Sequence, residues 1–142
     1  MAFRRQALLA AGLFDERLDV GAAGCSGDSE MWHRILKRGG LCRYEPSAVV
    51  FHYHRRDEPG LKRQLHAYMS GHAAALLVQR EAHASGGELR RLLVTLPLHY
   101  AASLKRRALG RARPEDAFTL TELSGLISGI VFYFRRSLWR TR

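Results

Sequence analysis

Two acidic residues, Asp28 and Glu30, stand where a glycine-rich segment passes into a stretch with helical periodicity. A short apolar run follows downstream, and it ends in the basic, histidine-rich sequence 52–56. A carboxylate can remove the proton of a hydroxyl group. Imidazole and guanidinium groups can stabilise a diphosphate, and an imidazole can also hold its metal ion. This combination is what a site for sugar transfer from a nucleotide-sugar donor needs.

The elements that must position these residues are short and mixed in type. Glycine and proline mark their ends, and apolar spacing distinguishes helix from strand. The predicted segments are a helix over 3–13 that stops at Gly12, a glycine-rich loop over 21–27, a helix over 29–38, and strands over 41–44 and 48–52.

The rest of the chain has helical periodicity and a basic character. We predict helices over 61–84, 88–109 and 114–138, the second of them bent at Pro97. The chain therefore divides into a mixed front part, 1–58, and a helical basic extension, 59–142.

Several segments of the front part have a recognisable order and spacing: Met1 to Leu8, Gly12 to Glu16, Gly27 to Arg34, Gly39-Gly40, Tyr44-Glu45-Pro46 and Val49 to Arg55. In this order they resemble the second half of a family 2 inverting glycosyltransferase of the GT-A fold. The resemblance implies an α/β fold class: the C-terminal, acceptor and base part of a Rossmann-like GT-A domain, followed by the helical extension.

The resemblance also implies roles for individual residues. Asp28 matches the general base, and Glu30 falls where a second acid sits near the acceptor. The other implied positions are Asp15 and Trp32 on the acceptor side, and His52, His54 and Arg55 at the donor diphosphate, with His52 as a metal ligand. A divalent ion, Mg or Mn, is implied by the family and not by visible ligands.

Each of these residues also has a simpler interpretation. Asp28 can cap the helix that follows it, and Glu30 can interact with the helix dipole. Trp32 can pack in the interior. His52 and His54 can be ordinary surface histidines, while Arg55 can pair with the acids at 57–58.

The resemblance begins at residue 1, without the family's nucleotide-binding βαβ unit and Asp-x-Asp motif. We therefore expect a fragment with little transfer activity by itself. The rival interpretation is a non-catalytic remnant that binds a membrane or a partner subunit.

The charge of the chain restricts its partners. It has 142 residues and a formal net charge of +10, with most of the excess after residue 62. This favours anionic partners such as phosphates or an anionic membrane surface. No nucleic-acid motif is found, so nucleic acid is not an expected partner, and the expected acceptors are glycan, lipid-linked or protein hydroxyls. Two cysteines and no secretion signal favour a cytoplasmic location, peripheral at the inner face of the membrane.

Overall fold

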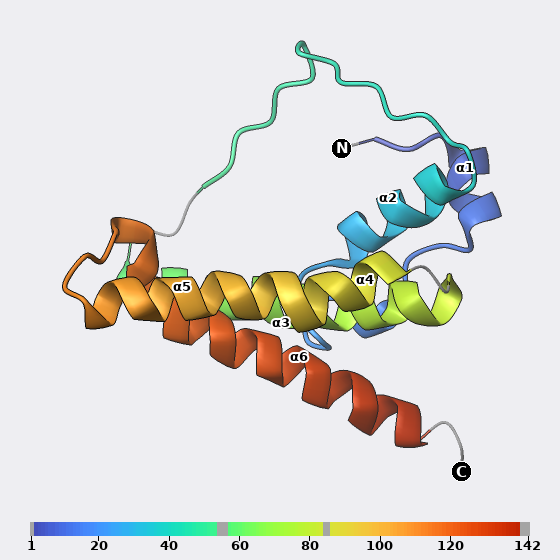
Figure 1. The fold of residues 1–142 in the computed structure, drawn as a ribbon. Helices are drawn as coiled ribbons and strands as arrows, with labels where there is room; N and C mark the ends of the chain where they lie inside the picture. Colours follow the sequence, from blue (N-terminus) through green and yellow to red (C-terminus); the bar gives the residue numbers. More distant parts are fainter. Residues whose placement is uncertain (1, 54–56, 84–85, 140–142) are drawn as a thin grey trace.

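The computed structural model of this chain describes residues 2–53, 57–83 and 86–139. Within those residues every regular element is a helix (Figure 1). The predicted α/β fold class is therefore wrong. The resemblance to a GT-A glycosyltransferase domain is wrong with it, because the sheet that defines such a domain does not occur in the described part of the chain.

The two predicted strands, 41–44 and 48–52, are the origin of this error. In the structure they belong to an exposed connection that arches away from the helices between α2 (Gly27–Lys37) and α3 (Glu58–Ala82) (Figure 1). A helix forms its backbone hydrogen bonds locally, whereas a strand needs a neighbouring strand. The described residues offer no such neighbour. The connection therefore does not form strands, although its residue types favour them.

The predicted helices are confirmed, with ends that shift by a few residues. The helix predicted over 88–109 is continuous, but its turn just before Pro97 is a π-helix, η2 (Arg91–Thr95). Proline has no backbone N–H and its ring crowds the preceding turn, so a wider turn accommodates it. The other described elements are α1 (Arg5–Ala11), η1 (Glu16–Leu18), α4 (Gly86–Arg90), α5 (Leu96–Ala108), η3 (Pro114–Phe118) and α6 (Thr119–Trp139).

Helices α3 and α6 pack closely because glycines of α6 face the backbone of α3. Gly125 lies against the carbonyl oxygen of His66, and Gly129 lies against that of Ser70. A Cβ atom at either glycine would overlap that oxygen. The order of these contacts shows that the two helices run in the same direction. Small residues spaced four apart are the pattern that lets helix backbones approach this closely.

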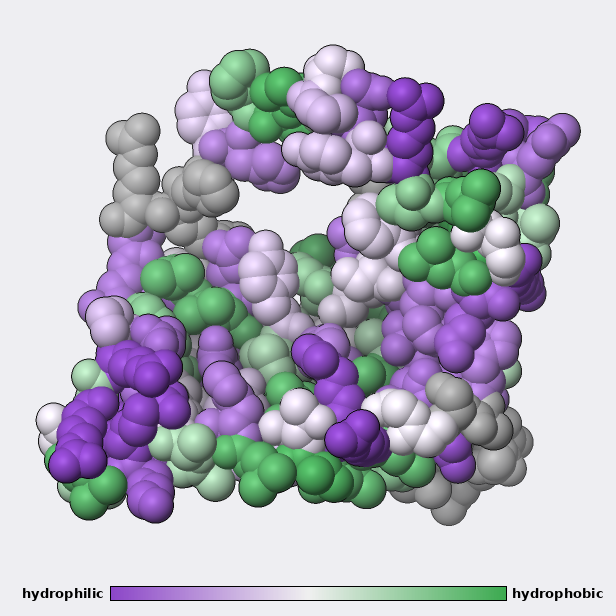
Figure 2. Space-filling view, turned by 45° about the horizontal axis from the view of Figure 1, so that its top comes forward, coloured by the Kyte–Doolittle hydropathy of each residue, from purple (hydrophilic) through white to green (hydrophobic). Residues whose placement is uncertain are grey.

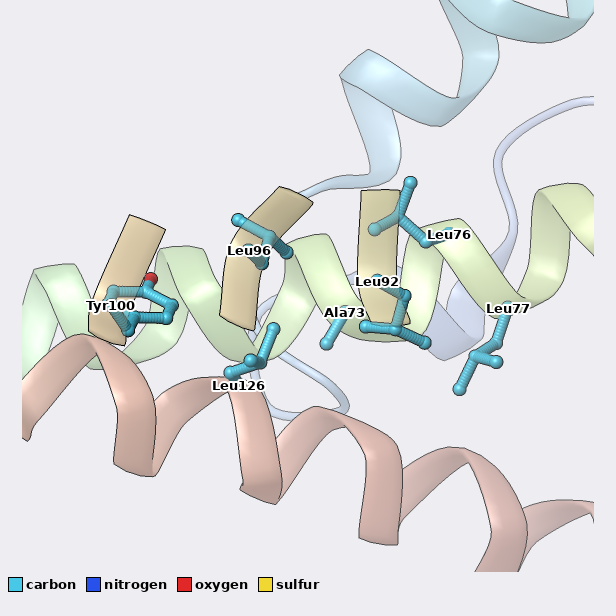
Figure 3. Close-up of a cluster of buried hydrophobic side chains, with 7 residues drawn as sticks. All are labelled: Ala73, Leu76, Leu77, Leu92, Leu96, Tyr100 and Leu126. Atoms are coloured by element: carbon cyan, nitrogen blue, oxygen red, sulfur yellow. The ribbon is translucent and has the colours of Figure 1, made fainter. Parts of the chain in front are cut away.

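An apolar core joins α3 and α6 to the α5 helix. Its side chains come from all three helices and from η2, and Figure 3 shows them lying between and beside these helices. Full burial of a leucine-sized side chain contributes roughly 1.5–3 kcal/mol. The buried residues of this cluster are Ala73, Leu76, Leu77, Leu92, Leu96, Tyr100 and Leu126.

The glycine-rich loop before α2 packs against α3. Gly24 has a φ of +143°, and a Cβ atom there would overlap the carbonyl oxygen of Ala67. On α3, a Cβ atom at Gly71 would meet the backbone nitrogen of Cys25. The Cys25 N–H also donates to the Ala67 carbonyl at 3.4 Å. The glycines therefore allow two backbones to approach, and this contact fixes where α2 begins.

Candidate functional site

The two acids in the first turn of α2 have opposite environments. Asp28 is exposed, and its Oδ1 accepts hydrogen bonds from the backbone nitrogen of Ser29 at 2.7 Å and from the Ser29 Oγ at 3.3 Å. Glu30 is only 1% exposed and forms an ion pair with Arg34, at 2.7 Å between Oε1 and Nε. A substrate hydroxyl could therefore reach the carboxylate of Asp28, whereas that of Glu30 is enclosed.

Arg34 connects α2 to the end of α1. Its Nη1 donates to the carbonyl oxygen of Ala11 and its Nη2 to that of Leu13, each at 2.5 Å. The last carbonyl groups of a helix have no partner within the helix, so this guanidinium satisfies groups that would otherwise lack one. Glu30 holds the guanidinium in place. The pair is thus a structural junction between the two short helices.

Asp15 also forms hydrogen bonds and an ion pair with an arginine. Arg17 donates to it from its backbone nitrogen at 3.0 Å and from its Nη2 at 2.6 Å, and its Nη1 reaches Glu81 of α3 at 2.9 Å. Burial disfavours the charged carboxylate, but the hydrogen bonds from Arg17 outweigh burial, so the pKa of Asp15 is lowered. A pocket of about 330 Å³ has both Asp15 and Glu30 in its wall, together with the two arginines that neutralise them.

Trp32 follows Asp28 by one helical turn. Residues four apart share a face of a helix, so the carboxylate and the indole ring are presented on the same side of α2. Trp32 is 41% exposed and lines an open, mainly apolar pocket of about 500 Å³. The opposite wall of this pocket comes from the connection after α2 and includes Leu41 and Tyr44.

The structure does not bring His52, the one predicted donor residue that it describes, to this face. His52 lies in the exposed connection and lines neither the pocket at Trp32 nor the pocket at Asp15 and Glu30. His54 and Arg55 lie outside the described residues. A diphosphate cluster formed by these three residues therefore stays a prediction.

The implied divalent metal, Mg or Mn, stays a prediction. In the described residues, no three His, Cys, Asp or Glu side chains gather in a group that could hold a metal ion. Mg²⁺ prefers oxygen ligands in octahedral geometry, and His52 offers only ring nitrogens.

Two polar contacts were not anticipated from the sequence. Asp116 is 2% exposed and accepts hydrogen bonds from Ser103 at 2.6 Å and from Arg106 Nε at 2.9 Å, which lower its pKa, the arginine bond contributing most. On α3, His72 accepts a hydrogen bond from Arg91 Nε at 3.0 Å. Both contacts link residues of different elements, so spacing along one helix could not reveal them.

Helix α6 has an apolar side that the rest of the structure leaves uncovered. The stretch Pro114–Arg136 is long and apolar enough to cross a membrane. Only 22% of its most apolar window is buried. Leu120, Ile127, Val131 and Phe134 are exposed, and their spacing places them in one row, here called the apolar face of α6. Figure 2 shows apolar side chains gathered along the lower edge of the molecule, with hydrophilic groups beside them.

Searches against family models, curated proteins and solved structures find no match to this chain. Two surfaces are therefore the candidate functional sites: the side of α2 with Asp28 and Trp32, and the apolar face of α6. The first offers an accessible carboxylate beside an aromatic ring. The second offers a large apolar contact area.

Proposed function

We propose that the apolar face of α6 attaches the chain to an anionic membrane surface. The observation that carries this proposal is the exposure of four large apolar side chains in one row of a long helix. Apolar surface left in water costs roughly 25 cal/mol per Å². The boundary between lipid headgroups and acyl chains removes that cost for a helix that lies in the membrane plane.

The neighbouring helix favours a position along the membrane rather than across it. Because α3 packs beside α6 and runs parallel to it, a crossing α6 would draw α3 into the bilayer. Helix α3 carries Lys62, Arg63, Arg80 and Glu81, and a charged side chain at the bilayer centre costs at least about 2.5–3.5 kcal/mol. A shallow position leaves these charges in water.

Basic side chains stand before and after the apolar face of α6. Lys105 and Arg111 are exposed just ahead of the helix, and Arg135 and Arg136 are exposed near its end. A basic residue near an anionic surface contributes about 1 kcal/mol to binding. The apolar contact and these charges together supply the two signals that stable peripheral attachment requires.

Co-sedimentation of the full chain with vesicles tests this proposal. We expect binding to vesicles that contain phosphatidylglycerol, weaker binding to pure phosphatidylcholine, and a loss of affinity as added salt screens the charges. If the chain stays in the supernatant with anionic vesicles at low salt, membrane attachment through this helix is incorrect.

A second candidate function is sugar transfer with Asp28 as general base. It is supported by the accessible carboxylate of Asp28 and the exposed ring of Trp32 one turn away, on which a sugar could pack. The carboxylate would take the acceptor's hydroxyl proton while the hydroxyl oxygen attacks the anomeric carbon and the donor's diphosphate leaves. The donor in this proposal is a nucleotide sugar, and the acceptor is a glycan, lipid-linked or protein hydroxyl.

Replacement of Asp28 tests the second candidate. The full chain is incubated with radiolabelled nucleotide sugars and membranes from its source cells, and incorporated label is counted. Asp28→Asn should abolish incorporation while keeping the helix start, because the N-cap of α2 is Ser26 and asparagine keeps a side-chain oxygen that can accept from the Ser29 nitrogen. Asp19→Asn, at another exposed acid, should retain it. Full incorporation by Asp28→Asn would contradict the role of Asp28.

A further inference from the structure

We propose that α5 lies on the same anionic membrane surface as α6, so that the two helices form one lipid-binding surface. This inference rests on the proposed attachment through α6, and it names a second helix that contacts the lipid. It concerns one side of α5 and of the turn before it, here called the outer row of α5, which consists of Val94, Leu98, Ala102 and Leu109.

The outer row points away from the core of the molecule. Leu96 and Tyr100 are buried in the core cluster with side chains of α3, and Leu98 stands two residues from each of them. Two residues turn an α-helix by about 200°, so Leu98 faces the opposite side, and it is 65% exposed. Val94 and Leu109, four residues before Leu98 and eleven after it, share this side and are also exposed.

The apolar face of α6 also points away from α3. Ile127 stands two residues from Gly125 and from Gly129, which lie against the backbone of α3. A hydrogen bond of 2.5 Å between the hydroxyl groups of Ser103 and Thr119 holds the start of α6 beside α5. Figure 1 shows α5 and α6 as neighbours, with α3 behind α5. The two outward rows can therefore rest on one flat surface.

The charges of this part of the chain identify lipid as the occupant. No Asp or Glu occurs in the stretch 89–113. Arg90 and Arg91 are exposed before the apolar stretch 92–104, and Lys105 and Arg107 are exposed after it. An apolar stretch between basic ends is typical of a helix that lies in the membrane interface, where its charges meet anionic headgroups.

The same pattern places α5 along the membrane surface. At 1.5 Å per residue the stretch 92–104 is about 20 Å long, whereas the hydrocarbon core is about 30 Å thick. A crossing helix would therefore draw one of its basic ends into hydrocarbon. Lys105 continues the outer row, seven residues after Leu98. Its alkyl chain can follow the apolar surface while its ammonium group reaches a lipid phosphate.

A second copy of the chain fits the outer row less well. Both ends of the apolar stretch are basic, so a copy packed on it in either direction would bring Arg91 or Lys105 beside basic groups of the other copy. Like charges placed together in this way oppose association. An anionic surface meets both ends with the opposite charge.

A nitroxide label at Leu98→Cys, in a full chain with both native cysteines replaced by serine, tests this inference. On vesicles that contain phosphatidylglycerol, the label should become more accessible to oxygen and less accessible to a water-soluble nickel chelate. A label at residue 98 that stays accessible to the chelate while one at residue 127 is sheltered would overturn the inference and leave attachment through α6 intact. Sheltering of residue 98 from both reagents without vesicles would indicate a second copy and would also overturn it.

A vesicle titration supplies a second measurement with a matched control. Leu98→Gln should weaken binding to anionic vesicles about tenfold, because it removes an apolar side chain from the outer row. Leu41→Gln makes the same change at an exposed leucine outside α5 and α6, and it should leave the affinity unchanged. Because both leucines are exposed, both variants should keep the helical circular dichroism of the unmodified chain. Equal affinities of the two variants would contradict a lipid contact through α5.

Discussion

Gly129 of α6 lies so close to the carbonyl oxygen of Ser70 in α3 that no side chain fits between the two helices. Gly125 makes the same kind of contact with His66 one turn earlier. These contacts fix the rotation of α6 about its own axis. As a result one side of the helix faces α3, and the side with Ile127 faces outward.

Gly129→Ala should destabilise the fold by about 1–3 kcal/mol, because the added methyl group overlaps backbone that cannot move aside cheaply. Urea unfolding followed by circular dichroism measures this change. Gly87→Ala is the matched control, since a Cβ atom at Gly87 meets nothing within 4 Å. Equal stability of the two variants would show that α6 does not pack against α3 through Gly129.

Glu30→Ala should cost about 3–5 kcal/mol of unfolding free energy, because it breaks a buried ion pair and leaves the Arg34 guanidinium without its carboxylate. Lys62→Ala, which removes an exposed ion pair within α3, should change the unfolding free energy little. The same urea titration measures both variants. A small effect for Glu30→Ala would contradict the enclosed junction between α1 and α2.

His72 should make the fold sensitive to mild acid. Burial, and then repulsion from Arg91, lower the pKa of its imidazole in the folded state. Unfolded chains therefore bind a proton more readily, so the stabilising effect is complete above pH ~6.5, the ordinary histidine value, and is lost as the pH falls through the folded pKa. Urea midpoints measured on either side of this window should show a smaller acid loss for His72→Gln. An unchanged acid loss would contradict this role of His72.

Ile127→Lys should weaken binding to anionic vesicles by at least about tenfold, because it removes an apolar side chain from the centre of the apolar face of α6. Leu41→Lys adds the same charge at a fully exposed apolar residue outside α6, and it should leave binding unchanged. Vesicle titrations compare the two variants. If Ile127→Lys loses no affinity, or gains as much as Leu41→Lys does, the binding is due to overall charge.

The helices could be predicted from the sequence because their signals are local. Gly12 ends α1, Asp57 caps α3 by accepting from the Gly60 nitrogen, and Pro114 begins the last helical stretch. The difference in exposure between Asp28 and Glu30 could not be predicted in this way. It depends on Arg34 reaching the end of α1, although the four-residue spacing of Glu30 and Arg34 was a visible signal.

The prediction of the fold class was wrong for a physical reason. The apolar run at 48–52 has strand propensity, but strand pairing depends on a neighbour that a propensity pattern does not reveal. The two glycines of α6, spaced four apart, were the signal for its contact with α3, and only the structure shows which helix they face.

The depth of residue 127 in the bilayer tests the central claim of membrane attachment most directly. A nitroxide label at Ile127→Cys, in a chain with both native cysteines replaced by serine, is compared with a label at native Cys42 in the Cys25→Ser chain. On anionic vesicles the label at 127 should become more accessible to oxygen and less accessible to a water-soluble nickel chelate, while the label at Cys42 should not change. A label at 127 that stays fully accessible to the nickel chelate would contradict membrane attachment through α6.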